Sequence, residues 1–237
     1  MSTFDDLLVV QQHDTTVDQL RHRRATLPEL TELARIEDEL VAVDRAMADV
    51  TARRDDVARR QKRFEDELAG VEAKVKETEG RLYSGAITVP RELQALQADV
   101  ESLRKRCSTL EDGVLEAMTE REPLDEEIGV LEAKRAGLDG DGGRLRVAIA
   151  EAEAAIEAQL SAEQSARQEA AAGLPEDVSR LYEDLRRKLG GVGAARLVNR
   201  RCTGCHLTLP ATEVDRIRKE PPDALIQCDQ CARILVR

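Results

Sequence analysis

Aromatic side chains are nearly absent from this sequence, which has two Phe, two Tyr and no Trp among its 237 residues. A globular domain of this length normally uses more aromatic residues to fill its core. Apolar residues make up 41% and charged residues 35% of the chain, a balance typical of long helices that share a narrow seam. Such a seam has no room for a deep pocket, so we expect neither a small-molecule substrate nor enzymatic activity.

Long apolar runs are missing as well. No stretch approaches the ~18 consecutive apolar residues of a membrane-spanning helix. The opening Met-Ser-Thr-Phe-Asp-Asp lacks the basic stretch and apolar core of a signal peptide. We therefore expect a cytoplasmic protein without membrane contact, and in that compartment paired cysteines favour a metal site over disulfides.

Two heptad series dominate the first part of the chain. Apolar residues recur at steps of three and four from Ile36 to Leu82, and again from Leu93 to Leu138. Between them, residues 83–90 gather Gly, β-branched residues and Pro, which indicates a turn. The two series mirror each other: a seam position of the first and the position of the second that adds to it to give 171, such as Phe64 and Cys107, are both on the seam. The pattern predicts an antiparallel hairpin with its tip at 83–90 and Pro90 in the first turn of the returning helix.

Polar residues interrupt the two seams at four positions, and such interruptions usually set register and partner choice. They are Arg54, Gln61, Arg121 and Arg135. His13 and Cys107 also fall on the seam. We interpret Cys107 as a small hydrophobe facing Phe64 rather than a nucleophile, and His13 as no metal ligand, because it has no Cys or second His near it.

Helix breakers occur at one level of both predicted arms: Pro28 on the first and the Gly-rich segment 137–143 on the second. This coincidence predicts a shared bend, although two unrelated loops would also explain it. The apolar pattern resumes beyond both breakers, so the hairpin is predicted to cover residues 1–173. A second domain, a helix followed by a small cysteine-bearing module, is predicted over 174–237.

Charge is spread unevenly along the chain, whose net charge is −11. Residues 178–237 hold 12 Lys and Arg against 7 Asp and Glu, whereas residues 1–177 hold the remaining 24 against 40. The net charge is therefore +5 for residues 178–237 and −16 for residues 1–177. An acidic hairpin disfavours indiscriminate nucleic-acid binding along its length, while the basic end remains open to it.

The strongest chemical motif is a pair of C-x₂-C sequences, Cys202–Cys205 and Cys228–Cys231. Two such knuckles supply the four soft ligands of one tetrahedral Zn²⁺. A rubredoxin-like iron site or an iron–sulfur cluster uses the same ligands, and two vicinal disulfides would need an oxidising compartment. With four cysteine ligands no position is left for water activation, so we expect one structural zinc on which folding of the module depends. Within the module, a helix is expected over 210–218, and strands over 225–227 and 233–236.

The tip Tyr-Ser-Gly…Pro-Arg-Glu-Leu-Gln-Ala-Leu and the ending Cys-Thr-Gly-Cys-His-Leu-Thr-Leu-Pro…Cys-Asp-Gln-Cys-Ala-Arg-Ile-Leu resemble the bacterial C4-type zinc-ribbon family. The resemblance implies a mainly α fold, a long kinked antiparallel coiled-coil hairpin with a small C-terminal β-rich zinc ribbon. It implies zinc ligation by Cys202, Cys205, Cys228 and Cys231. Family members are described as adaptors or chaperones that bind a sigma factor, messenger RNA or secretion components. Ala232 stands where the family commonly has Gly, which suggests a slightly different second knuckle.

Two functions follow as hypotheses. The first is weak, salt-sensitive binding of RNA or DNA by basic residues of the ribbon, in a regulatory role. The candidate contacts are Arg196, Arg200, Arg201, Arg216, Arg218, Lys219, Arg233 and Arg237. The absence of Phe, Tyr and Trp from the ribbon argues against base stacking. The second is a protein–protein adaptor whose hairpin and ribbon dock a transcription or secretion component.

Overall fold

The computed structural model describes residues 3–221 and 224–237, and helices dominate it. The helices are α1 (Thr3–Ala25), α2 (Pro28–Tyr83), α3 (Pro90–Ala171), α4 (Glu176–Lys188) and α5 (Ala211–Lys219). The strands are β1 (Ala194–Val198), β2 (Arg201–Cys202) and β3 (Ile234–Val236). Among the described residues, no helix is long and apolar enough to cross a membrane.

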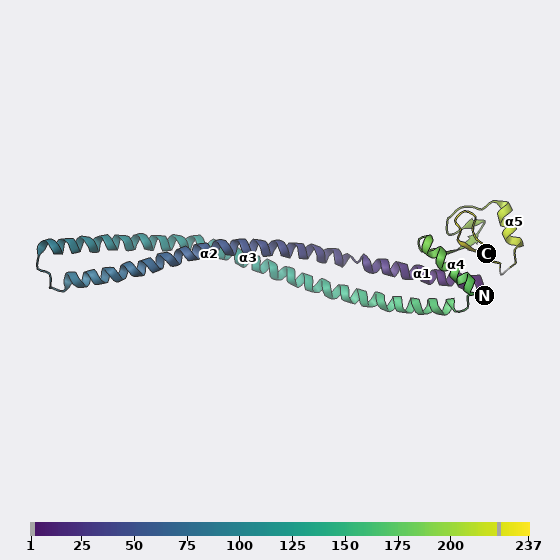
Figure 1. Cartoon of the computed structure of the whole chain (residues 1–237), viewed down its shortest axis with the longest axis horizontal. Coiled ribbons are helices and arrows are strands. Elements are labelled where there is room, and N and C mark those ends of the chain that lie inside the picture. Colours follow the sequence, from purple (N-terminus) through teal and green to yellow (C-terminus); the bar gives the residue numbers. More distant parts are fainter. Residues whose placement is uncertain (1–2, 222–223) are drawn as a thin grey trace. The chain divides into compact units, whose positions relative to one another are not determined.

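Residues 33–144 form one of two units and contain the predicted hairpin. Here α2 and α3 run side by side in opposite directions and are joined by a short tip loop at residues 84–89 (Figure 1). Gly85 in this loop has φ +70°, a conformation that glycine adopts without strain. Pro90 is the first residue of α3, where its missing N–H costs no hydrogen bond. The predicted hairpin is confirmed, and residues 84–89 form the loop that joins its arms.

The polar residues that interrupt the seams bond across the two arms. Arg121 donates to the side-chain oxygen of Gln61 at 3.0 Å, and Arg135 donates to Asp44 at 2.8 Å. Arg54 lies 3.7 Å from Asp125. These contacts join opposite arms at defined positions, so they hold the register of a seam whose apolar residues alone would tolerate a shift of one heptad.

The pairing of side chains differs from the simple mirror sum. The ring of Phe64 lies against Gly113, where an added Cβ would be 3.2 Å from it, rather than at the level of Cys107. The numbers of Phe64 and Gly113 add to 177, not 171. The contacts of the interrupting residues have similar sums, 182 for Gln61 with Arg121 and 179 for Asp44 with Arg135. The slant of helical side chains toward the N-terminus of their own helix adds only about two to such a sum. The two arms are therefore paired close to one heptad away from the predicted register, a shift that heptad phase alone allows.

Both predicted breakers lie near the boundary between the two units, at Glu32/Leu33 and Arg144/Leu145. The first arm is interrupted at Thr26–Leu27, and Pro28 starts α2. The second arm is not interrupted, because α3 stays helical through residues 137–143 and also through Pro123. Neighbouring turns tolerate the glycines there at an entropic cost. The shared bend remains a prediction.

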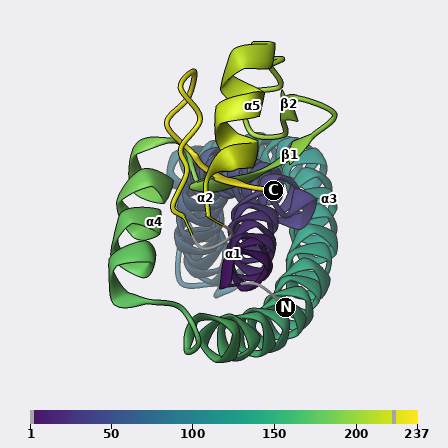
Figure 2. The same cartoon turned by 90° about the vertical axis from the view of Figure 1, so that its right-hand side faces the viewer.

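The second unit comprises the residues up to Glu32 together with Leu145–Arg237. Figure 2 shows α1 with the end of α3, α4 and the strands of the ribbon around it. Its core draws on α1, α4 and two strands. The core residues are Phe4, Leu7, Val10, Val178, Tyr182, Leu185, Ala194, Ile234 and Val236. This core contains residues from both sides of the predicted boundary at 173/174, so the ribbon shares its packing with the base of the hairpin.

The ribbon contains a three-stranded sheet in the order β2-β1-β3. Strands β1 and β2 are antiparallel, and β1 and β3 are parallel with Ala194 opposite Ile234. The predicted helix over 210–218 is confirmed as α5. The strand expected over 225–227 is wrong: this segment makes only an isolated bridge from Gln227 to Ile234, because the second knuckle begins directly after it.

Candidate metal centre

Two knuckles of nearly identical backbone geometry present the four cysteines. In the first, the Cys202 N–H donates to Leu207 O at 3.1 Å and the His206 N–H donates to Cys202 O at 2.8 Å. In the second, the Cys228 N–H donates to Arg233 O at 2.9 Å and the Ala232 N–H donates to Cys228 O at 2.8 Å. Each knuckle therefore closes on the same two hydrogen bonds.

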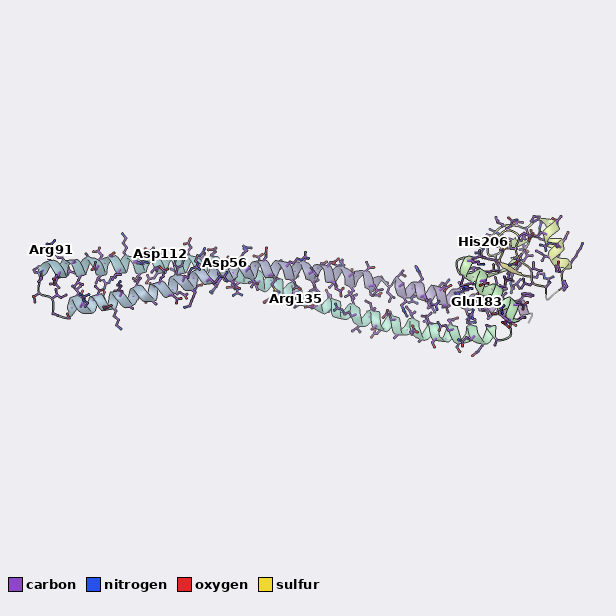
Figure 3. All side chains as sticks on the ribbon, in the orientation of Figure 1. Asp56, Arg91, Asp112, Arg135, Glu183 and His206 are labelled. Carbon is purple, nitrogen blue, oxygen red and sulfur yellow. The ribbon has the colours of Figure 1, made fainter. Side chains whose placement is uncertain are left out.

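The residue after the last cysteine of each knuckle adopts a left-handed conformation, with φ +62° at His206 and +61° at Ala232. The expected difference of the second knuckle is thus absent from the backbone. Ala232 takes the left-handed conformation in place of glycine, at a cost for any residue with a Cβ. His206, which Figure 3 labels, is exposed and is not one of the four clustered ligands.

Gly204, inside the first knuckle, allows two segments to approach closely. A Cβ at this position would lie 2.5 Å from Cδ of Arg233 and 3.0 Å from Cβ of Ala195. The Gly204 N–H also donates to the sulfur of Cys202 at 3.4 Å, which stabilises negative charge on that sulfur. Glycine is therefore required here by contact, and not by its φ angle.

The four sulfur atoms are arranged as a tetrahedral metal requires. They all lie within 4.8 Å of one another, with Cys202 to Cys231 at 3.9 Å and Cys205 to Cys228 at 4.0 Å. A tetrahedron with metal–sulfur bonds of ~2.3 Å has sulfur–sulfur edges of about 3.8 Å. The residues present therefore fit one Zn²⁺, and the set leaves no ligand position for a water molecule.

The thiols themselves show why the cluster needs a cation. Burial raises the pKa of Cys202, and it raises the pKa of Cys228 to about 12. Burial acts in the same direction on Cys231, but hydrogen bonds from the backbone and side chain of Arg233 and from neighbouring thiols lower its pKa to about 7. Four thiolates in this environment require a compensating positive charge, which a bound Zn²⁺ supplies.

Comparison with known proteins agrees with this geometry. Residues 10–190 match the CT398-like coiled coil hairpin domain. The chain belongs to that family. Residues 201–235 match the C4-type zinc ribbon domain, which favours zinc over the iron alternatives that the ligands alone leave open. The metal is a structural zinc held by Cys202, Cys205, Cys228 and Cys231.

Several proteins are similar to this chain over nearly its whole length. An uncharacterized protein of Mycobacterium tuberculosis, found in two strains, is 29% identical over 231 residues, covering 98% of this chain and 94% of the relative. A solved structure from Mycobacterium smegmatis has a TM-score of 0.88 at 23% identity, covering 100% and 97% of the two chains. CT398 of Chlamydia trachomatis has a TM-score of 0.69 at 20% identity, covering 99% and 97%. HP0958 of Helicobacter pylori has a TM-score of 0.52 at 16% identity, covering 99% and 96%.

Two of the basic residues considered as contacts, Arg233 and Arg237, each donate to more than one backbone carbonyl. Arg233 donates from Nε to Val192 O at 2.9 Å and from its guanidinium to Leu189 O at 3.2 Å. Arg237 donates to Ile217 O at 3.0 Å and to Glu220 O at 2.9 Å. The first arginine joins the second knuckle to the end of α4, and the second arginine holds the end of α5.

The other basic residues lie on the surface and differ in their partners. Arg196 is 3.3 Å from Asp5, and Arg216 is 3.3 Å from Asp229. Arg201 donates to His206 O at 2.7 Å. Arg218 has only a long 4.0 Å contact with Asp215, and 72% of its side chain is exposed. Arg200 and Lys219 are exposed, and no described residue bonds to either side chain. Their role as contacts remains a prediction.

Gln11 was not predicted, although it links α1 to the ribbon. Only 7% of this residue is exposed, its side-chain oxygen accepts from Gly193 N at 2.7 Å and Ala194 N at 3.2 Å, and its amide donates to Gly191 O at 3.0 Å. These bonds satisfy the backbone that leads into β1. A polar residue off the predicted seam gives no sequence signal of such a contact.

A buried ion-pair network lies beside Gln11. Asp14 is 5% exposed and accepts from the Tyr182 hydroxyl at 2.8 Å and from Arg167 Nε at 3.2 Å. Arg167 also bonds to Glu183 of α4, a residue that Figure 3 labels. Burial, together with the Asp14 carboxylate, raises the pKa of Tyr182 well above its usual value. The network stabilises the packing of α4 against the base of the hairpin.

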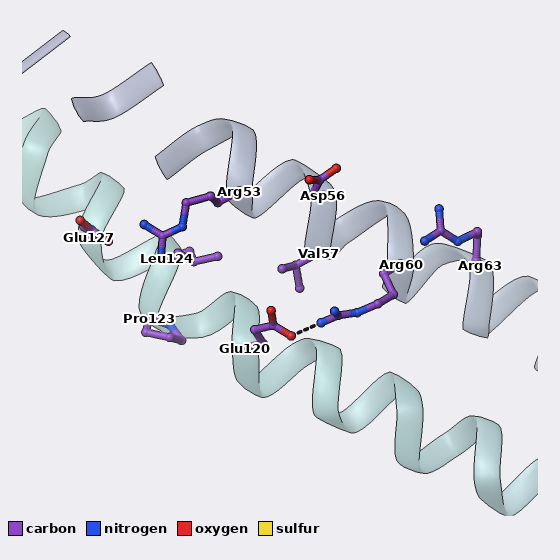
Figure 4. A pocket seen from close by; sticks show the side chains of 9 residues that line it. All are labelled: Arg53, Asp56, Val57, Arg60, Arg63, Glu120, Pro123, Leu124 and Glu127. Atoms are coloured by element: carbon purple, nitrogen blue, oxygen red, sulfur yellow. Dashed lines mark hydrogen bonds and ion pairs between the residues drawn. The ribbon is translucent and has the colours of Figure 1, made fainter. Parts of the chain in front are cut away.

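The hairpin unit also contains a cavity of about 740 Å³ between its arms, beside Pro123 (Figure 4). Val57 and Leu124 form its apolar part, and Arg60 bonds to Glu120 across it. Of the charged groups that line it, Arg60 and Glu120 thus pair with each other. The cavity is best explained as incomplete packing next to the proline.

Proposed function

We propose that the chain is a non-enzymatic adaptor that binds a protein partner through its zinc ribbon. The observation that carries this proposal is the mixed surface of the ribbon. Large apolar side chains are exposed there, Val198 at 44%, Leu207 at 51% and Leu225 at 40%, on a module that also exposes arginines. Arginine combined with exposed apolar area is typical of protein interfaces.

The tip of the hairpin supports the same proposal. Tyr83 is 81% exposed and Val89 is 50% exposed, although neither side chain is needed for packing in the hairpin unit. Tyr is a favoured contact residue because it buries a large area at a small entropic cost. Each of the two units therefore has an exposed apolar surface of its own, which suits a protein that bridges partners.

Nucleic-acid binding is the second candidate, and the exposed cations Arg200, Arg218 and Lys219 favour it. Ion pairs already partly neutralise Arg196 and Arg216. About three phosphate contacts would give a slope of log affinity against log salt of about −3 or shallower, and therefore weak and salt-sensitive binding. The lack of aromatic residues in the ribbon also removes the usual stacking platform.

The deciding experiment is crosslinking with mass spectrometry in cells, with and without nuclease treatment. The adaptor function predicts crosslinks from the ribbon or the tip to one dominant protein that survive nuclease. Loss of all ribbon crosslinks after nuclease, together with a gel shift that weakens steeply with salt, would instead establish the nucleic-acid function. Crosslinks confined to the polar sides of α2 and α3 would contradict both.

A further inference from the structure

The turn between β1 and β2 contains a strained arginine. Val198 and Arg201 pair across the two strands, so only Asn199 and Arg200 form the loop. Both have positive φ, +49° and +66°. This is the conformation of a type I′ hairpin turn, whose second position strongly favours glycine. Arg200 therefore occupies a position where its Cβ is unfavourable, and a reason for an arginine must come from its side chain.

Contacts within the chain do not supply that reason. The neighbouring Arg201 donates to His206 O, and Arg196 pairs with Asp5. In the part of the chain that the structure describes, the guanidinium of Arg200 has no hydrogen bond and no ion pair. A side chain that is exposed, charged and held in a strained conformation without an internal partner points to an external one.

Arg200 borders a groove of about 520 Å³ between this turn and α5. The apolar side of the groove is formed by Leu197, Val214 and Ile217. Its polar rim carries Arg200, Arg218 and Arg237 with Asn199. The guanidinium of Arg237 bonds to carbonyls at the end of α5, so its charge is fixed at the rim. Three cations therefore surround an apolar floor, and no acidic side chain among the described residues lines the groove.

We propose that this groove binds an acidic segment of a partner protein, with an aliphatic side chain on the floor and a carboxylate between Arg200 and Arg218. The proposal rests on the adaptor function and names the partner's chemistry. Arginine suits a carboxylate because its planar guanidinium can donate two parallel hydrogen bonds. The apolar floor favours a peptide over single-stranded nucleic acid, whose bases stack mainly on Phe, Tyr and Trp side chains that the ribbon lacks.

The test uses the zinc-loaded full chain and fluorescence anisotropy with four defined probes. These are a short peptide of Asp, Glu and Leu, its Asn/Gln/Leu counterpart, its Asp/Glu/Gly counterpart and a short single-stranded RNA. The variants are Arg200→Gly, which relieves the strain and removes the cation, and Arg218→Gln. Lys219→Gln is the matched control, because it removes one exposed positive charge of the same module outside the groove.

We expect only the acidic–aliphatic peptide to bind well, and Arg200→Gly and Arg218→Gln to weaken it by about tenfold. Lys219→Gln should change its affinity by less than about twofold. Arg200→Gly should leave the melting temperature unchanged or raise it, which separates lost binding from lost folding. Equal weakening by all three variants, equal binding of the neutral peptide, or preference for RNA would overturn the groove proposal. The adaptor function would survive that result if crosslinks in cells map a protein partner to the tip or another surface.

Discussion

Gln11 offers a sharp test of how the hairpin base and the ribbon are joined. Replacing it with Ala removes the acceptor of two buried N–H groups, at Gly193 and Ala194, and the donor to Gly191 O. A buried donor without a partner costs about 1–3 kcal/mol, and water entering the vacated space recovers part of this. We therefore expect Gln11→Ala to lower the free energy of unfolding of this unit by about 2–4 kcal/mol.

Gln12→Ala provides the matched control, since Gln12 is the next residue of the same helix and is exposed. It should change stability by no more than about 0.5 kcal/mol. Both variants would be unfolded in urea with saturating zinc, and hydrogen exchange would report on the amides of Gly193 and Ala194. Those two amides should lose protection in Gln11→Ala only. If both variants lose equal stability, or if the two amides stay protected, Gln11 does not join the two segments as described.

Three further predictions concern the metal, one knuckle and the buried tyrosine. Elemental analysis of the purified chain should find one zinc. Removal of this zinc by a chelator should expose the amides of β1 and β3 to hydrogen exchange, while the circular dichroism spectrum keeps most of its helical signal. Strands that stay protected without metal would contradict this. Ala232→Gly should raise stability by about 1 kcal/mol in denaturant unfolding, because Ala232 has positive φ, whereas Ala154→Gly at an exposed position inside α3 should lower it by a similar amount. The raised pKa of Tyr182 means that above about pH 10 the unfolded chain loses a proton that the native state keeps, so stability should fall as pH rises. Tyr182→Phe should be less stable at neutral pH and show a shallower alkaline decline in the same assay.

The parts of the fold that sequence reasoning found are those governed by short-range rules. Heptad periodicity located the arms, Gly85 and Pro90 located the tip, and cysteine spacing located the metal site. Each of these is set by a repeating pattern or a fixed spacing along one stretch of chain.

Contacts between distant segments were not accessible in the same way. The mirror sum placed Phe64 opposite Cys107, but the ring lies against Gly113, because heptad phase alone does not distinguish registers that differ by seven positions. The bonds of Gln11 to the start of β1 carry no local pattern at all. Arg233 was expected at the surface as a contact, but its guanidinium holds carbonyls of the α4–β1 segment. The sequence gives the charge of a side chain, but only the structure shows which groups that side chain contacts.

The shared core of α1, α4 and the strands has a consequence for synthesis on the ribosome. Leu7 and Val10, which emerge early, find their partners Ile234 and Val236 only after almost all of the chain has been made. Chains emerge at about 5–20 residues per second, so this apolar surface remains uncovered for on the order of ten seconds or more. During that interval the nascent segment is a target for chaperones and for aggregation. Completion of the cysteine module is therefore the event that ends this exposure.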